Sequence, residues 1–257
     1  MKLYLSGCGG LHHMMFGACS YIEEHYDLDK IKEIRSISGG NYVAAALLSN
    51  YSTRSIWELW SKRLSALIKD YPLTFLFKFY GMISKHSDDI LQKLSAKEQL
   101  KQYILLTYLF KGEKKWMNNF TSNDDYRECV IAGSYIPCFN GVTKIYYKYQ
   151  KQCCIDGALC KYPIINGPTT NDKDTDILKI NKNDFSSIVP TTTLLFWLIY
   201  GLFSTYEHHK KQFDIGYLYA KLFLKNKLDK LLLPRTDKSQ KYLNITGKIK
   251  WSQNTFI

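Results

Sequence analysis

Short apolar runs alternate with longer amphipathic stretches over the first 50 residues of the chain. The pattern predicts four elements, in the order strand 2–5, helix 11–26, strand 31–37 and helix 40–49. Each strand leads through a glycine-rich turn into its helix. This alternation is typical of an α/β fold with a mostly parallel sheet and helices on both faces. The small residues Gly17 and Ala18 are expected to let the first helix approach that sheet closely.

The rest of the chain is less regular. Residues 55–109 look helical, because Trp57, Trp60, Leu64 and Leu67 recur at helical spacing, and we interpret this stripe as core packing. The aromatic segment 73–82 interrupts the helical pattern and suggests a lid or a membrane-facing element. Further strands are predicted at 128–132, 144–149, 153–155 and 177–180, with a polar loop at 167–176. Residues 1–233 are expected to form one domain, and 234–257 a polar, basic C-terminal tail.

One stretch approaches the length of a membrane span. Residues 188–206 carry no charged side chain, and a transmembrane helix needs about 20 mostly apolar residues. Pro190 and three threonines weaken the first half of this stretch, so a buried or interfacial helix is favoured over a true span. The N-terminal segment is too short and too broken by glycine for a signal peptide.

Composition and charge narrow the class of protein. A length of 257 residues with 46% hydrophobic and 23% charged residues is ordinary for one globular domain. The net charge of +12 predicts a polyanionic partner, either nucleic acid or an anionic membrane surface. Because no zinc finger, basic zipper or aromatic RNA-binding signature occurs, the membrane is favoured and no nucleic acid is expected.

Cysteine and histidine spacing gives two further expectations. The seven cysteines form a poor disulfide framework and fit a reducing, cytoplasmic location. The adjacent pairs His12-His13 and His208-His209 lack the spacing that places two ligands on one face, so no metal is expected.

The segment Ser36-Ile37-Ser38-Gly39-Gly40 lies between the second predicted strand and its alanine-rich helix. A nucleophile elbow needs this setting, because the tight turn requires small residues two positions before and after the serine. The positive end of the following helix would also stabilise negative charge near Ser38. The alternative is an ordinary serine cap of that helix.

A second glycine-rich turn, Gly7-Cys8-Gly9-Gly10, follows the first predicted strand. If the two strands are parallel neighbours, this turn lies beside Ser38 at the carboxyl edge of the sheet. Glycines there would let backbone N–H groups face an oxyanion. A nucleotide-phosphate loop is the competing interpretation, and it is weaker because His12 stands where the last glycine of G-x-G-x-x-G belongs.

A nucleophilic serine also needs a base. The order Ser38, Asp156, His208 matches an α/β-hydrolase triad, but that fold places several strands before its elbow and this chain has room for one. Asp156, followed by Gly157 at the end of a predicted strand, is the preferred base because its carboxylate can reach the serine directly. The alternative is a plain Asp-Gly turn.

With these residues in place, the chain resembles the patatin-like phospholipase domain family over roughly residues 3–225. The stretches that carry the resemblance are the loop Ser6-Gly7-Cys8-Gly9 with Leu11 and Gly17, the elbow and helix 36–46, the stretch 132–137 (AGSYIP), the motif Asp156-Gly157-Ala158-Leu159, and Gly216-Tyr217 with Ala220. The chain departs from the family pattern in three ways. Ser36 replaces the first glycine of the elbow, Gly10 and His12 replace the usual residues of the later loop, and no Lys or Arg follows the glycines.

The resemblance implies a three-layer α/β/α fold and a Ser–Asp dyad that works without histidine, metal or cofactor. Ser38 would attack an acyl ester, Asp156 would be the base, and backbone amides around Cys8, Gly9 and Gly10 would hold the oxyanion. The expected function is hydrolysis of phospholipid or neutral lipid esters by a protein bound peripherally to membranes or lipid droplets. Two alternatives remain open. One is a patatin-fold module that has lost catalysis and binds lipid or protein, favoured by His12; the other is a lipid acyltransferase.

Overall fold

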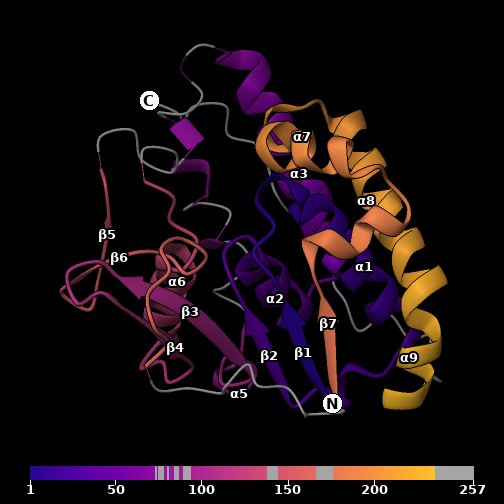
Figure 1. Ribbon diagram of the computed structural model, residues 1–257, viewed down its shortest axis with the longest axis horizontal. Helices are drawn as coiled ribbons and strands as arrows, with labels where there is room; N and C mark the ends of the chain where they lie inside the picture. The colour runs from indigo at the N-terminus through magenta and orange to yellow at the C-terminus, as the bar shows by residue number, and fades with distance from the viewer. Residues whose placement is uncertain are drawn as a thin grey trace.

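The described part of the chain forms an α/β fold around one seven-stranded sheet (Figure 1). The computed structural model describes residues 1–72, 74, 78, 79, 81–83, 87, 88, 94–137, 144–165 and 176–234. The strands are β1 (Lys2–Leu5), β2 (Glu33–Ser36), β3 (Gln102–Tyr108), β4 (Glu113–Met117), β5 (Tyr147–Tyr149), β6 (Gln152–Asp156) and β7 (Ile177–Ile180). Their order is β5-β6-β3-β2-β1-β7, and β4 pairs with β3.

The sheet is mixed, so the prediction of a mostly parallel sheet is wrong. Strands β7, β1, β2 and β3 are parallel, whereas β4 and β6 run antiparallel to β3, and β5 runs antiparallel to β6. Two tight hairpins, β3–β4 and β5–β6, account for two of these antiparallel pairs, since strands joined by a short turn must be antiparallel. Gln150 and Lys151 form the second turn, with φ angles of 46° and 63°, the backbone that a two-residue hairpin requires.

The helices surround this sheet in a way that fits a three-layer α/β/α arrangement. They are α1 (His12–His25), α2 (Gly40–Leu48), α3 (Thr53–Asp70), α5 (Ala96–Gln99), α6 (Asn123–Ala132), α7 (Thr191–Tyr200), α8 (Tyr206–Tyr219) and α9 (Lys225–Leu231). Shorter helical turns are η1 (Gly9–Leu11), η2 (Leu28–Lys30), η3 (Lys182–Ser187), η4 (Gly201–Phe203) and η5 (Ala220–Leu224). In Figure 1, α1, α8 and α9 lie on the β1–β7 side of the sheet and α6 lies by β3–β6.

The two predicted strands and two predicted helices of the first 50 residues are confirmed. The strand predicted at 153–155 lies within β6, and the one predicted at 177–180 is β7. Residues 128–132, predicted as a strand, are the end of helix α6. The side chain of Ser122 caps this helix by accepting from the N–H of Asp125, and a short apolar run has no period that separates strand from helix. Only residues 147–149 of the predicted strand 144–149 form β5.

The helix predicted over 55–109 is also partly wrong. Helix α3 ends at Asp70, and the far end of the segment is strand β3. The stripe of Trp57, Trp60, Leu64 and Leu67 is buried, as its interpretation as core packing requires. Residues 73, 75–77 and 80 of the segment 73–82 lie outside the described residues, as do 166–175 and 235–257. The division into a domain of 1–233 and a tail therefore stays a prediction.

Helices α1 and α8 pack with their backbones almost in contact. A Cβ on Gly17 would lie 2.0 Å from the Phe213 carbonyl oxygen, and one on Gly216 would lie 1.8 Å from the Met14 carbonyl oxygen. Gly17 therefore makes its close approach to α8, and the expectation that it faces the sheet is wrong. This contact fixes α1, whose N-terminal end carries the glycine-rich loop.

The uncharged stretch 188–206 is not one long helix. It begins just after η3 and contains α7 and η4. Leu194 and Trp197 of α7 are buried, whereas Leu195 and Phe196 are more than half exposed. This two-sided pattern agrees with the buried or interfacial helix that the sequence favours over a span. Across the described part of the chain, no helix combines the length and apolar character that crossing a membrane requires.

Candidate active site

Strands β2 and β6 meet end to end on the same edge of β3. Strand β2 pairs in parallel with the first part of β3, up to Ser36 opposite Ile104. Strand β6 runs the other way along the last part of β3, and ends with Asp156 opposite Leu106. The carboxyl ends of the two strands therefore converge beside Leu105, which brings the turn after β2 against Asp156.

The turn after β2 has the backbone of a nucleophile elbow. Ser38 has a φ of 57°, in the left-handed region that costs free energy for any residue with a side chain. Gly40 begins α2, and a Cβ there would lie 2.9 Å from the Leu5 carbonyl oxygen. The turn is closed by the N–H of Gly40, which donates to the carbonyl of Ile37 at 3.0 Å. This turn conformation places the Ser38 side chain at the N-terminal end of α2.

Ser38 and Asp156 form a buried hydrogen-bonded pair. The Ser38 hydroxyl donates to Oδ2 of Asp156 at 2.5 Å, across 118 residues of sequence. Ser38 is 6% exposed and Asp156 1%. The other carboxylate oxygen, Oδ1, accepts from the N–H of Ala158 at 2.7 Å. Both oxygens are thereby held, and one of them faces the serine.

The environment of Asp156 makes its carboxylate a stronger base than usual. Burial raises the pKa of Asp156 from 3.8 to about 6, while the hydrogen bonds from Ser38 and Ala158 and the charge of Lys114 oppose that rise. A carboxylate with a pKa near 6 is still ionised at neutral pH. It can therefore accept a proton there, which a general base must do.

The glycine-rich loop lies against the elbow, as the parallel pairing of β1 and β2 predicts. A Cβ on Gly7 would lie 3.3 Å from Cβ of Ser38 and 3.2 Å from Cβ of Ala158, and one on Gly39 would lie 3.0 Å from Sγ of Cys8. The Cys8 thiol is fully buried, and burial first and then the charge of Asp156 raise its pKa. Cys8 is therefore not a competing nucleophile, because a thiolate is disfavoured there.

Backbone N–H groups of this loop and of the elbow have no hydrogen-bond acceptor among the described residues. Within the described ranges, the N–H groups of Gly9, Gly10 and Gly39 donate to no other residue. Gly9 has a φ of 47°, and Gly9 and Gly39 are only partly buried. These N–H groups are the donors that a developing negative charge near Ser38 would need.

His12 holds this loop from behind. The backbone N–H of His12 donates to the Gly9 carbonyl, and its Nδ1 lies 3.1 Å from the same oxygen. Its Nε2 accepts a hydrogen bond from Nε1 of Trp60 at 2.6 Å. Because the indole can only donate, the proton of the ring is on Nδ1 and points at Gly9. The C=O of Gly9 and the N–H of Gly10 belong to one planar peptide and point in opposite directions. Fixing one therefore fixes the other.

A network of polar side chains supports the elbow from the other side. Ser134 donates to the Ser38 carbonyl at 2.7 Å and accepts from Asn41 at 3.1 Å. Gln102 donates to the Ser36 hydroxyl at 2.8 Å and to the Asn41 carbonyl at 3.1 Å, and the hydroxyl of Tyr126 donates to Gln102. The Ser36 hydroxyl in turn faces the Tyr103 carbonyl at 3.3 Å. Ser36 is thus a buried residue whose hydroxyl is hydrogen-bonded, at the position where the patatin-like pattern has glycine.

Sequence reasoning did not single out Gln102, Asn41 or Ser134 as supporting residues. Ser134 lies in the stretch 132–137 that carries part of the family resemblance, and the neighbouring Tyr135 carbonyl accepts the N–H of Asp156 at 2.8 Å. That stretch touches both members of the pair, which is the signal that could have identified Ser134. Gln102 lies in a segment predicted as helix, and no local pattern places it near Ser36.

The histidines lie away from the Ser38–Asp156 pair. His12, His13 and His209 form a buried cluster. The ring centroids of His12 and His13 lie 3.9 Å apart, and the rings of His13 and His209 stack at 4.0 Å. Burial lowers the pKa of His12 to about 3 and that of His209 to about 4. His208 packs its ring on Trp197. Of the five described histidines, none is hydrogen-bonded to Ser38 or Asp156, so the arrangement is not a histidine triad.

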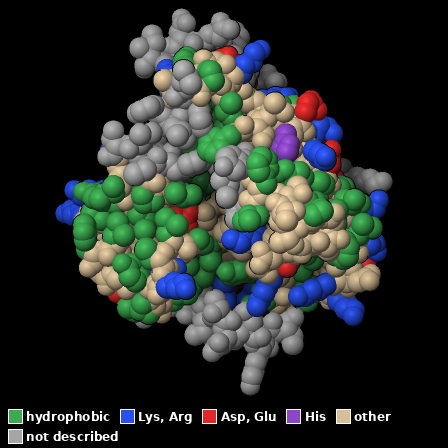
Figure 2. Space-filling view, turned by 45° about the horizontal axis from the view of Figure 1, so that its top comes forward, with side chains coloured by type: hydrophobic (Ala, Val, Ile, Leu, Met, Phe, Trp, Pro, Cys, Tyr) green, Lys and Arg blue, Asp and Glu red, His purple; other side chains and the backbone are tan. Residues whose placement is uncertain are grey.

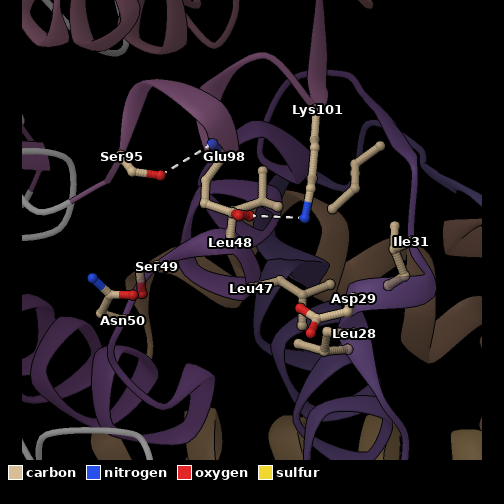
Figure 3. Close-up of a pocket in the computed structure, with 11 residues that line it drawn as sticks. Leu28, Asp29, Ile31, Leu47, Leu48, Ser49, Asn50, Ser95, Glu98 and Lys101 are labelled. Carbon is tan, nitrogen blue, oxygen red and sulfur yellow. Dashed lines mark hydrogen bonds and ion pairs between the residues drawn. The ribbon is translucent and has the colours of Figure 1, made fainter.

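A pocket of about 320 Å³ opens at the opposite edge of the sheet (Figure 3). Ile31, Ile34 and Lys101 line it at the amino ends of β2 and β3, with Leu47 and Leu48 from the end of α2. Lys101 forms an ion pair with Glu98 at 3.1 Å on its wall. The pocket lies at the far ends of these strands from Ser38, and it is not part of the candidate site.

In the described ranges, no three His, Cys, Asp or Glu side chains gather as a bound metal ion would require. The arrangement contains a serine held in a strained turn, a buried carboxylate that accepts its hydrogen bond, and neighbouring N–H groups with no acceptor among the described residues. Such a set of groups can perform nucleophilic acyl transfer.

Compared with models of protein families and with curated proteins, the chain matches none of them.

Proposed function

We propose that the protein is a serine hydrolase of lipid acyl esters with a patatin-like Ser38–Asp156 dyad. One observation carries the proposal. The hydroxyl of Ser38, in a strained turn with φ of 57°, donates to a buried carboxylate at 2.5 Å. A serine that only capped a helix would bond to that helix's own backbone and would need no left-handed conformation.

In the first half of the reaction, Ser38 Oγ attacks the carbonyl carbon of the ester. Its proton passes to Oδ2 of Asp156, which already accepts that hydrogen bond. The carbonyl oxygen becomes an oxyanion, and the N–H groups of Gly9, Gly10 and Gly39 are placed to stabilise it. Collapse of the tetrahedral intermediate breaks the ester C–O bond. Asp156 returns the proton to the leaving alcohol, and the acyl group stays on Ser38.

In the second half, water attacks the acyl-enzyme. Asp156 again takes the proton, now from water, and gives it back to Ser38 as the fatty acid leaves. No cofactor or metal takes part in these steps. A lipid alcohol in place of water would give transfer of the acyl group, which is the acyltransferase alternative.

The expected substrate class is a phospholipid or a neutral lipid, and the expected partner is an anionic membrane surface. The net charge of +12 supports attraction to such a surface. We therefore expect a peripheral enzyme that meets its substrate at the interface. The non-catalytic alternative was favoured by His12, but His12 contacts the Gly9 carbonyl and occupies none of the loop N–H groups, which supports catalysis instead.

The proposal is tested with a fluorophosphonate probe and mixed phospholipid vesicles, on the unmutated protein, Ser38→Ala and Asp156→Asn. We expect labelling and fatty acid release only from the unmutated protein, with no effect of a chelator. Equal labelling and release by Ser38→Ala would sink the proposed nucleophile. Added glycerol separates the two acyl acceptors, because a transferase would form acylglycerol from the same acyl-enzyme.

A further inference from the structure

Three segments beside Asp156 expose apolar side chains at one edge of the molecule. They are residues 109–115, which contain the β3–β4 turn, residues 144–151, which contain the β5–β6 turn, and residues 158–165, which follow Asp156. Their exposed hydrophobic residues are Phe110, Ile145, Tyr146, Tyr162, Ile164 and Ile165. We call the exposed side chains of these three segments the apolar–lysine surface.

Contacts between the segments make this one surface. The rings of Phe110 and Tyr146 lie 6.4 Å apart. The backbone N–H of Lys114 donates to the Pro163 carbonyl, and that of Ile165 donates to the Lys114 carbonyl, each at 2.8 Å. Figure 2 shows hydrophobic side chains gathered on the left of the molecule, where Figure 1 places β3 to β6, with Lys and Arg side chains among them.

The degree of exposure is unusual for apolar residues. Phe110 is 83% exposed and Ile145 63%, so neither contributes to the core. Single exposed apolar residues are ordinary, but a contiguous exposed group marks a surface that binds a partner or a membrane. The tyrosines add rings with a polar tip, the kind of side chain that settles at a membrane–water interface.

Charge identifies the chemistry of the partner. The three segments contain seven lysines and one glutamate, a net charge of +6, which is half of the net charge of the whole chain. All of these lysines except Lys114 are exposed. A partner that accepts both the apolar side chains and this charge must combine an apolar interior with an anionic face, and an anionic lipid bilayer does so.

We propose that the apolar–lysine surface docks the protein onto anionic lipid bilayers, with Phe110 and Ile145 entering the interface and the lysines contacting lipid headgroups. The proposal deepens the proposed function and rests on it for its purpose, because the segment after Asp156 would then face the membrane that holds the substrate. A nucleic acid would satisfy the lysines alone. Its phosphate backbone offers nothing to isolated aliphatic side chains such as Ile145, Ile164 and Ile165.

The test uses the Ser38→Ala protein, so that vesicles stay intact whatever the catalytic activity. Its binding to sedimented vesicles of phosphatidylcholine, alone and mixed with phosphatidylserine at about 7 to 3, is measured at low and high salt. We expect binding only to the mixed vesicles and weaker binding at high salt. Adding Phe110→Ser should weaken binding by about tenfold. The matched control is Leu222→Ser, on η5, where Leu222 is 60% exposed, and it should bind unchanged.

Equal binding by the Phe110→Ser and Leu222→Ser proteins would overturn the proposal. Binding to duplex RNA without binding to mixed vesicles would also overturn it and would identify a nucleic-acid surface. Both substituted side chains are exposed, and equal melting temperatures would show that the variants fold alike. Hydrolysis of a soluble short-chain ester by the protein with Ser38 intact is measured separately. Its absence, with vesicle binding intact, would refute the dyad and leave the docking surface standing.

Discussion

Ser38 Oγ and Asp156 Oδ2 lie 2.5 Å apart because strands β2 and β6 end on the same edge of β3, opposite residues 104 and 106. The two strands run in opposite directions, so their carboxyl ends face each other across a single residue, Leu105. In an all-parallel sheet the two ends would lie side by side on neighbouring strands. The mixed sheet thus places the carboxylate directly at the end of the strand that carries the serine.

The first prediction concerns the pH dependence of activity. Burial raises the pKa of Asp156 to about 6, and only the ionised carboxylate can accept the proton of Ser38. The value of kcat/KM for a soluble ester is therefore expected to rise through pH of about 6 and then to level off. The histidines of the buried cluster add no second limb in this range, since burial lowers the pKa values of His12 and His209 to about 3 and 4.

Initial rates between pH 4.5 and 8 check this expectation. A rise of kcat/KM centred on the ordinary carboxylate pKa of about 4 would contradict the assignment of Asp156 as the base. A pH profile unchanged by Asp156→Asn would contradict it as well. Hydrolysis must be followed on a soluble ester, because membrane binding has a pH dependence of its own.

The second prediction uses the charge of Lys114. That charge lowers the pKa of Asp156, although burial outweighs it. Removing it in Lys114→Met is therefore expected to raise the pKa of Asp156 and to move the rising limb of kcat/KM to higher pH, with the same plateau. The matched control is Lys115→Met. Lys115 is the exposed neighbour on the same strand, and its side chain alternates to the other face of β4. An equal displacement of the limb in both variants would show a general effect of net charge instead.

The turn that holds Ser38 and the glycine-rich loop beside it could be predicted from sequence because both are local. Gly7–Gly10 and Ser36–Gly40 each lie in one strand–turn–helix unit, and the pairing of β1 with β2 follows from consecutive short strands. Asp156 was identified from its place at a strand end and from the family motif. Its approach to Ser38 depends on β3, and that strand was predicted as helix because the apolar run 104–106 has no period of its own.

The supporting residues were beyond sequence reasoning for a similar reason. Gln102 contacts Ser36 across 66 residues, and Trp60 contacts His12 across 48. Such pairs depend on the register of strands and the packing of helices, and a buried polar residue has no pattern that names its partner. Adjacent His12 and His13 were judged by their spacing as metal ligands, and His12 also by its place in the glycine-rich loop. Their actual contacts are indole N–H groups of α3.

The third prediction concerns Gly157. A Cβ at this position would lie 2.2 Å from the Leu105 carbonyl oxygen, so Gly157→Ala must push the backbone after Asp156 away from β3. We expect a loss of stability of about 1–3 kcal/mol and a fall in kcat of about 100-fold, because small displacements of a reacting group are costly. Urea unfolding and ester hydrolysis measure the two effects. Gly81→Ala is the control, since Gly81 is helical, exposed and has open space around its Cα, and it should be slightly stabilised. An active, stable Gly157→Ala protein would contradict the placement of this turn.

The fourth prediction concerns Ser36, which stands where the patatin-like pattern has glycine. Its hydroxyl accepts from Gln102 and faces the Tyr103 carbonyl, so Ser36→Gly is expected to destabilise the protein although it restores the pattern. The loss is about 1–2 kcal/mol for buried groups left without a partner, plus about 0.4–1 kcal/mol for the freer unfolded chain. Ser36→Ala measures the first of these losses alone, because it removes the hydroxyl without introducing glycine.

The same network holds the Asn41 carbonyl at the start of α2. For this reason kcat for a soluble ester should fall in both variants. Ser187→Ala, which removes an exposed hydroxyl bonded to the Asp184 carbonyl, is the control and should change neither quantity. If Ser36→Gly were as stable and active as the unmutated protein, the Ser36 hydroxyl would contribute to neither stability nor catalysis.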